Sequence, residues 1–189
     1  IKLISAIGQD IYGKKIHDEC KMNGVDMSES LFLEGGATST YLSVLDETGD
    51  MAVAISSMDI FERISTEFIK SKDQIIQKSQ LVVIDCNMPK RIIEFLVTTY
   101  KDLVFFLDTV STAKAVKVKD LIGYFHTIKP NKIEAELLSG IKIDTREDLL
   151  RAGKYFVDQG VKNVFISLGK DGAFFYNGRK SGIVSGPAM

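Results

Sequence analysis

Apolar residues in the second half of the chain form short runs, and segments with apolar positions at helical spacing separate these runs. Runs such as Leu81-Val82-Val83-Ile84 are typical of buried strands, and the segments between them are typical of amphipathic helices. The predicted strands are 81–85, 104–108, 126–128, 164–168 and 173–176, and the predicted helices are 89–100, about 116–122, 131–138 and 146–159. This alternation predicts right-handed βαβ units around a mostly parallel sheet.

The first residues of the chain continue the same α/β pattern. A short apolar run at residues 3–7 ends at Gly8 and predicts a strand. Residues 12–23 carry apolar positions at roughly helical spacing, and Asn23-Gly24 is a typical helix stop.

A hairpin is predicted where this alternation is interrupted. Residues 38–45 and 51–55 read as two strands, and the polar loop between them contains Gly49. The second strand places its larger apolar side chains on one face, namely Met51, Val53 and Ile55. We therefore interpret the hairpin as an excursion from the main sheet.

Composition limits the class of protein. The chain has 189 residues, of which 45% are hydrophobic and 26% charged, and this suits one globular domain, or one domain with a small appendage. We expect a single domain over residues 1–189. The formal net charge is −1 and the basic residues are dispersed, so neither a nucleic-acid polymer nor an anionic membrane is expected as the main partner, although a local basic pocket is compatible with this balance. Cys20 and Cys86 fit no metal-binding spacing and are too few for a disulfide framework, which favours a reducing compartment.

The ends of the chain and its hydropathy lead to two further expectations. No apolar run approaches the roughly 20 residues that a membrane span needs, so we expect no membrane association and a cytoplasmic location. The sequence opens at Ile1 without an initiator Met or a signal-peptide pattern, and we expect it to be a fragment that is incomplete at both ends.

Polar or glycine-rich segments follow four of the predicted strands. Ligands collect at the carboxyl ends of strands in open α/β sheets, so these segments are candidates for a binding site. They are Gly8-Gln9-Asp10, Asp85-Cys86-Asn87, Lys129-Pro130-Asn131 and Ser167-Leu168-Gly169-Lys170-Asp171-Gly172.

The third segment admits two interpretations. Asn131 lies at the start of a predicted helix, and Glu134 follows three residues later on the same side. The pair fits a capping box, in which each side chain bonds the backbone of the other residue. It also fits a Mg²⁺ site, in which an amide and a carboxylate hold metal-bound waters beside nucleotide phosphates.

The fourth segment is equally ambiguous by itself. The two glycines Gly169 and Gly172 would let backbone N–H groups approach an anion closely, but they also suit a tight turn between two strands. Neither a Walker-type phosphate loop nor a dinucleotide-binding GxGxxG motif is present.

Taken together and in order, these segments resemble the PfkB/ribokinase family of kinases. The resemblance rests on Ile7-Gly8-Gln9-Asp10-x-x-Gly13, on Lys129-Pro130-Asn131-x-x-Glu134-x-x-x-Leu138-x-Gly140 and on Ser167-Leu168-Gly169-x-x-Gly172-Ala173. It implies an α/β fold, a ribokinase-like three-layer sandwich, with a small β lid at about residues 37–56. It also implies transfer of the γ-phosphate of ATP, with Mg²⁺, to a hydroxyl of a small-molecule sugar or nucleoside.

The resemblance also implies roles for individual residues. Asn131 and Glu134 would organise Mg²⁺, through water, together with the phosphates. The nucleotide-binding turn would comprise Ser167, Leu168, Gly169, Lys170, Asp171 and Gly172. On the substrate side, Asn87 takes a sugar-facing position at which ribokinases carry Glu, and this departure argues against ribose itself.

Two further substrate-side candidates have plain structural alternatives. Asp10 is either a substrate contact or the N-cap of the helix that follows it. Thr40, on the hairpin, either faces the substrate or is an ordinary strand threonine.

Finer similarities point to the pseudouridine-kinase branch of the family, and hence to phosphorylation of the 5′-hydroxyl of pseudouridine. They lie in residues 38–46, 84–87 and 108–114. Another PfkB sugar kinase, similar to ribokinases or fructokinases, and a non-catalytic nucleotide- or sugar-binding protein remain alternatives. By the same resemblance the catalytic base, an Asp, is expected beyond Met189, and a homodimer is expected to form through the lid.

Overall fold

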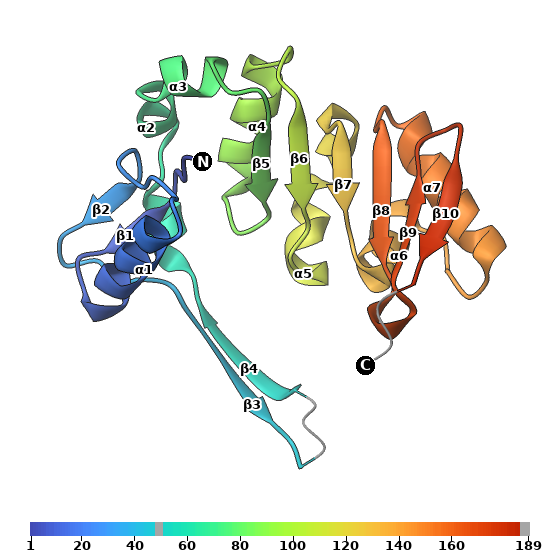
Figure 1. The fold of residues 1–189 in the computed structure, drawn as a ribbon, viewed down its shortest axis with the longest axis horizontal. Coiled ribbons are helices and arrows are strands. Elements are labelled where there is room, and N and C mark those ends of the chain that lie inside the picture. Colours follow the sequence, from blue (N-terminus) through green and yellow to red (C-terminus); the bar gives the residue numbers. More distant parts are fainter. Residues whose placement is uncertain (48–50, 186–189) are drawn as a thin grey trace. The chain divides into compact units, whose positions relative to one another are not determined.

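The computed structural model of the protein describes residues 1–47 and 51–185 (Figure 1). The chain divides into two compact units, Ile1–Lys72 and Asp73–Met189. That the whole chain forms one domain stays a prediction. Within the described ranges, no helix is long and apolar enough to cross a membrane.

The first unit contains a small βαβ arrangement. Strand β1 (Ala6–Gly8) pairs in parallel with β2 (Leu31–Leu33), and helix α1 (Ile11–Met22) connects them. The predicted strand and helix are thus present, although β1 begins three residues later than the apolar run suggests. Strand β2 was not predicted, because three residues are too few to show an alternating pattern.

The predicted hairpin is confirmed. Strand β3 (Thr40–Leu45) pairs antiparallel with β4 (Met51–Ser57), with Leu42 opposite Ile55 and Val44 opposite Val53. These four apolar side chains share one face, and each is more than half exposed. Part of the predicted connecting loop, residues 48–50, and the side chain of Met51 lie outside the described residues. The unit then ends with a 3₁₀ helix η1 (Asp59–Arg63) and helix α2 (Thr66–Lys70).

The second unit contains a six-stranded sheet of order β10-β9-β8-β7-β6-β5. Its strands are β5 (Val82–Asp85), β6 (Phe105–Asp108), β7 (Thr127–Lys129), β8 (Asn163–Ser167), β9 (Ala173–Tyr176) and β10 (Ser181–Val184). The neighbours β5, β6, β7 and β8 are parallel, whereas β9 and β10 join antiparallel at one edge. The sheet is therefore mostly parallel, as predicted.

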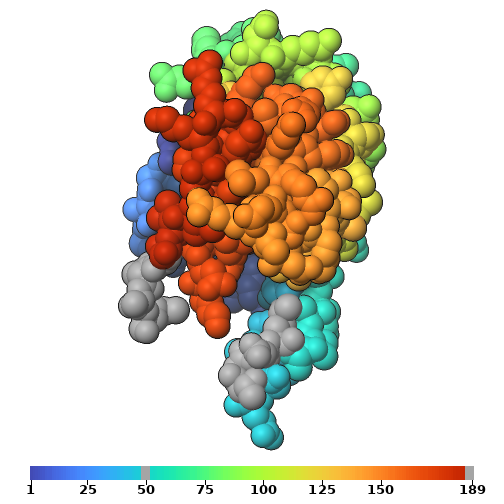
Figure 2. All heavy atoms as spheres, turned by 90° about the vertical axis from the view of Figure 1, so that its right-hand side faces the viewer, coloured from blue at the N-terminus to red at the C-terminus, as the bar shows by residue number. Residues whose placement is uncertain are grey.

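A layer of mutually contacting helices covers one face of this sheet. They are α4 (Lys90–Thr99), α5 (Thr112–Ala115), η2 (Val116–Tyr124), α6 (Lys132–Ser139) and α7 (Arg146–Asp158). The strand residues Ile84, Leu107, Ile128 and Ile166 are all buried and belong to the core of the unit. Figure 2 views the end of the unit where α7, in orange, lies beside the red edge strand β10.

Two short helices complete the second unit, and one predicted helix differs from its expected form. Helix α3 (Asp73–Gln77) precedes β5, and the 3₁₀ turn η3 (Gly169–Asp171) follows β8. The predicted α-helix at about residues 116–122 is a 3₁₀ helix. Its β-branched Val116 and Val118, and Gly123 near its end, are weak α-helix formers.

Candidate functional site

The parallel strands β5 to β8 of the second unit all end on the same side of the sheet. Their carboxyl ends, called the sheet edge from here on, carry charged and polar groups. Asp85 pairs in register with Asp108, and Asp108 pairs with Lys129. The Lys129 Nζ atom lies 3.1 Å from the Asp108 Oδ2 atom and forms an ion pair with it. The predicted binding segments after β5, β7 and β8 all follow this edge, as expected for an open α/β sheet.

Helix α6 begins with the predicted capping box. The Asn131 Oδ1 atom accepts from the Glu134 backbone N–H at 2.9 Å, and the Glu134 Oε2 atom accepts from the Asn131 backbone N–H at 2.9 Å. The Asn131 Nδ2 atom also donates to Glu134 Oε1 at 2.8 Å. The capping interpretation is thus confirmed, and the role in Mg²⁺ binding stays a prediction that the same geometry allows.

The Glu134 carboxylate also contacts the buried hydroxyl of Thr109, a residue that was not among the predicted site residues. Thr109, directly after β6, donates a hydrogen bond from its Oγ1 atom to Glu134 Oε2. Thr109 is fully buried and Glu134 is only 3% exposed. A threonine at a strand end is common, so no feature of the sequence marked this contact.

The two predicted nucleotide-binding segments lie side by side. Asn131 and Ser167 form a parallel β-bridge, and the Ser167 N–H donates to the Pro130 carbonyl at 3.0 Å. The capping box and the turn after β8 therefore share one end of the sheet. This adjacency is what a single phosphate-binding site built from both segments requires.

Hydrogen bonds within the turn after β8 set its shape. The Leu168 N–H donates to the Gly172 carbonyl at 2.8 Å, and the Gly172 N–H donates to the Gly169 carbonyl at 3.1 Å. Gly169 and Gly172 both have positive φ, at 62° and 91°. Gly169, Lys170 and Asp171 are exposed, so a ligand can reach this part of the turn.

Asn87 follows β5, which is the outermost of the parallel strands and lies three strands away from β8. Its backbone N–H donates to Asp85 Oδ1 at 2.7 Å and its Nδ2 atom donates to Asp85 Oδ2 at 3.0 Å. Its Oδ1 atom accepts from the Lys114 ammonium. These contacts fix the orientation of the amide, and the three strand spacings from β5 to β8 correspond to about 14 Å.

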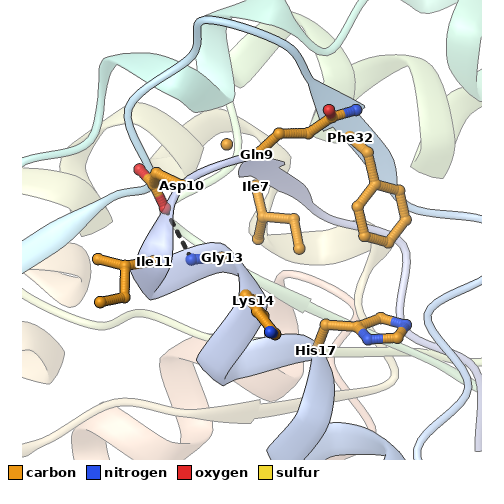
Figure 3. Close-up of a pocket in the computed structure, with 9 residues that line it drawn as sticks. Ile7, Gln9, Asp10, Ile11, Gly13, Lys14, His17 and Phe32 are labelled. Carbon is orange, nitrogen blue, oxygen red and sulfur yellow. Dashed lines mark hydrogen bonds between the residues drawn. The ribbon is translucent and has the colours of Figure 1, made fainter.

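Asp10 lies in the first unit and caps helix α1 (Figure 3). Its carboxylate accepts from the Thr38 backbone N–H, the Thr38 hydroxyl and the Gly13 N–H, each at 2.7 Å. These donors lower the pKa of Asp10 to about 2, with the two Thr38 bonds as the largest cause. The N-cap interpretation is thus confirmed, and substrate contact by Asp10 stays a prediction.

The glycines of the Gly8-Gln9-Asp10-x-x-Gly13 segment allow this close packing. A Cβ atom on Gly8 would lie 2.0 Å from the Gly36 carbonyl oxygen, and one on Gly13 would lie 1.9 Å from the Gly8 carbonyl oxygen. A pocket of about 570 Å³ lies beside the segment, where Phe32 and His17 meet edge to face (Figure 3).

The predicted site residues are distributed over both units. Asn87, Asn131, Glu134 and the turn 167–172 share the sheet edge of the second unit. Asp10 and Thr40, which pairs with Ser57 at the base of the hairpin, belong to the first unit. A shared site for the two groups stays a prediction.

The donor set at the sheet edge fits a magnesium ion carried by a nucleotide. Within residues 1–47 and 51–185, no group of three or more His, Cys, Asp or Glu side chains is placed to hold a metal ion by itself. Mg²⁺ commonly binds through one or two protein oxygens together with substrate phosphates. The Glu134 carboxylate and the Asn131 side-chain amide provide oxygen atoms of the kind that Mg²⁺ prefers as ligands.

The mostly parallel sheet carries two antiparallel strands, β9 and β10, and the first unit combines a βαβ arrangement with a β-hairpin. These features agree with the ribokinase-like class of α/β proteins that the resemblance implies. Solved structures agree with this class. The chain superimposes with a TM-score of 0.85 and 42% identity on a Clostridium perfringens protein described as a sugar kinase, covering 100% of this chain and 60% of that one. An Escherichia coli structure described as ribokinase II, in complex with ATP and Mg²⁺, is 20% identical and has a TM-score of 0.82, covering 100% of this chain and 63% of that one, and shows the shared fold.

The chain belongs to the pfkB family of carbohydrate kinases, whose family model matches residues 1–189. A relative named pseudouridine kinase, from Escherichia coli strain K12, is 37% identical over 173 residues. This match covers 92% of the chain and 55% of the relative. The chain thus spans only a little over half the length of that relative.

Proposed function

We propose that this chain is part of an ATP-dependent kinase that phosphorylates the 5′-hydroxyl of pseudouridine. The observation that carries the proposal is the bridge between Asn131 and Ser167, which joins the two family segments at one end of the sheet. Support for the acceptor comes from the relative named pseudouridine kinase.

The nucleotide end of the proposed site is built by α6 and the turn after β8. Asn131 and Glu134 would hold the phosphates and Mg²⁺ through water, and residues Ser167 to Gly172 would contact the nucleotide. Bound Mg²⁺ would neutralise charge on the transferring phosphoryl group. The contribution of the chain is then positioning, because the capping box holds the amide and the carboxylate in one fixed arrangement.

The acceptor end of the proposed site is Asn87. An amide both donates and accepts hydrogen bonds, which suits sugar hydroxyls and the edge of a base. The Asp85 and Lys114 partners hold this amide with its nitrogen toward the carboxylate and its oxygen toward the ammonium. Asn87 would thus offer a pre-oriented polar group to the nucleoside.

The β3–β4 hairpin is the proposed lid and dimer contact. Its apolar face, formed by Leu42, Val44, Val53 and Ile55, is more than half exposed at each position. An isolated two-stranded hairpin is marginally stable in water, so a partner surface would stabilise it. A second copy of the lid is the partner we propose, in a two-fold homodimer.

An acceptor panel tests the proposed function. The intact natural polypeptide is assayed for ADP release with pseudouridine, ribose, fructose and adenosine at saturating MgATP. We expect the highest kcat/KM for pseudouridine. A preference for ribose or fructose would show that the acceptor is wrong and leave only the family assignment.

A further inference from the structure

The Glu134 carboxylate is held from two different elements. Its own helix supplies the Asn131 N–H and Nδ2 donors, as in any extended capping box. The third donor, Thr109 Oγ1, comes from the end of strand β6. A capping box does not need this third bond, so the contact is additional to the capping of helix α6.

The distribution of these donors leaves one oxygen of Glu134 less occupied. Oε2 accepts from Thr109 Oγ1 and from the Asn131 N–H, whereas Oε1 accepts from Asn131 Nδ2. An ionised carboxylate has about four acceptor positions, so Oε1 retains capacity for another donor, such as a metal-bound water. Thr109 thereby helps to determine which oxygen of the carboxylate remains available.

Backbone strain marks the segment that presents the Thr109 hydroxyl. The next residue, Val110, has a φ of 65°, the only positive φ at a non-glycine position among the described residues. A β-branched residue in this region is a true outlier and costs about 1–3 kcal/mol. The turn is closed by bonds from the Val110 N–H to Asp108 Oδ1 at 3.0 Å and from the Ser111 N–H to the Thr109 carbonyl at 2.7 Å. Such strain persists where the surrounding structure requires one local conformation.

We propose that Thr109 is a positioning residue, which orients Glu134 toward nucleotide-bound Mg²⁺ by a hydrogen bond from the neighbouring strand. This inference rests on the proposed function, since it concerns the nucleotide end of the same site. Thr109 itself touches neither metal nor nucleotide. Its effect passes through Glu134 and depends on the hydroxyl rather than on the size of the side chain.

Calorimetric titration of the intact polypeptide with MgATP, and with ATP in EDTA, tests the proposal. Thr109→Val keeps the shape of the side chain and removes the hydroxyl, and Thr109→Ser keeps the hydroxyl. We expect Thr109→Val to weaken MgATP binding about 10-fold or more, the effect typical of removing a hydrogen-bond partner that orients a metal-binding side chain. Metal-free ATP binding should be unchanged, and Thr109→Ser should bind MgATP as the wild type does.

Thr127→Val is the matched control. Thr127 is a buried threonine on β7 whose hydroxyl contacts His126 and Asn163 instead of the site. Thermal melting of each variant checks folding, and Thr109→Ala serves in place of Thr109→Val if that variant does not fold. Glu134→Gln provides a second test, because Thr109→Val should add no further loss of MgATP affinity in that background.

Equal MgATP affinity in wild type and Thr109→Val, or equal losses in Thr109→Val and Thr127→Val, would overturn the positioning role. Failure of the proposed function looks different. In that case pseudouridine is not phosphorylated, while the metal-dependent effect of Thr109→Val on ATP binding is still observed. If the wild type does not bind MgATP, both proposals fail together.

Discussion

Gly172 allows a direct test of how the turn after β8 is built. Its backbone angles, φ 91° and ψ −132°, lie in a region that residues with a side chain rarely adopt. A Cβ atom at this position would also lie 2.0 Å from the Val184 carbonyl oxygen and 2.9 Å from the Ser185 Cα atom. Gly172→Ala therefore combines backbone strain with a collision against the end of β10.

The two contributions can be estimated separately. An unfavourable backbone conformation costs about 1–3 kcal/mol, and overpacking against backbone costs about as much again. Gly169→Ala is the matched control, because Gly169 also has a positive φ of 62° but an added Cβ would meet nothing within 4 Å. Gly169→Ala should therefore lower the free energy of unfolding only by the cost of the left-handed conformation, about 1–2 kcal/mol.

Urea unfolding followed by circular dichroism measures both variants. With a slope of about 2 kcal/mol per molar urea, the summed loss of about 2–6 kcal/mol would lower the urea midpoint of Gly172→Ala by about 1–3 M. The urea midpoint of Gly169→Ala should fall by clearly less than that of Gly172→Ala. Equal midpoints for the two variants would refute the argument, because only Gly172→Ala adds a collision with β10 to its backbone strain.

Two further predictions concern the lid and the nucleotide end. Val53→Asp places a charge on the apolar face of the lid and should convert a dimer toward monomer in light scattering, with loss of turnover, whereas Ala54→Asp on the opposite face should leave the mass unchanged. A monomeric wild type would exclude the lid dimer. Asn131→Ala and Glu134→Gln should lower kcat and raise the Mg²⁺ concentration required, and Glu136→Gln on the same helix should not. An unchanged kcat at limiting Mg²⁺ would leave both residues with a capping role alone.

The strands of the second unit were predictable because each buried strand is a continuous apolar run between polar turns. Strand β10 was missed, because Ser181–Val184 is a largely exposed edge strand without an apolar run. Only its pairing with β9 shows that it is a strand. Short helices such as α2 were missed for a related reason, since five residues show too little periodicity.

The candidate site was predictable only in part. Asn131, Glu134 and Ser167 were recognised by their order in the chain, but their adjacency depends on strands β7 and β8 being neighbours in the sheet. The Thr109 contact joins residues 25 positions apart and precedes a left-handed valine, and no sequence pattern predicts either feature. Such contacts follow from tertiary packing rather than from local preference.

The most direct test of the central claim is ³¹P NMR of the intact polypeptide incubated with MgATP and pseudouridine. The account predicts loss of the ATP γ-phosphate signal and growth of a phosphomonoester signal split by the two protons on the 5′-carbon of the nucleoside. Omission of pseudouridine should leave ATP intact. Unchanged ATP in the complete mixture, or release of inorganic phosphate without a nucleoside phosphomonoester, would contradict the claim.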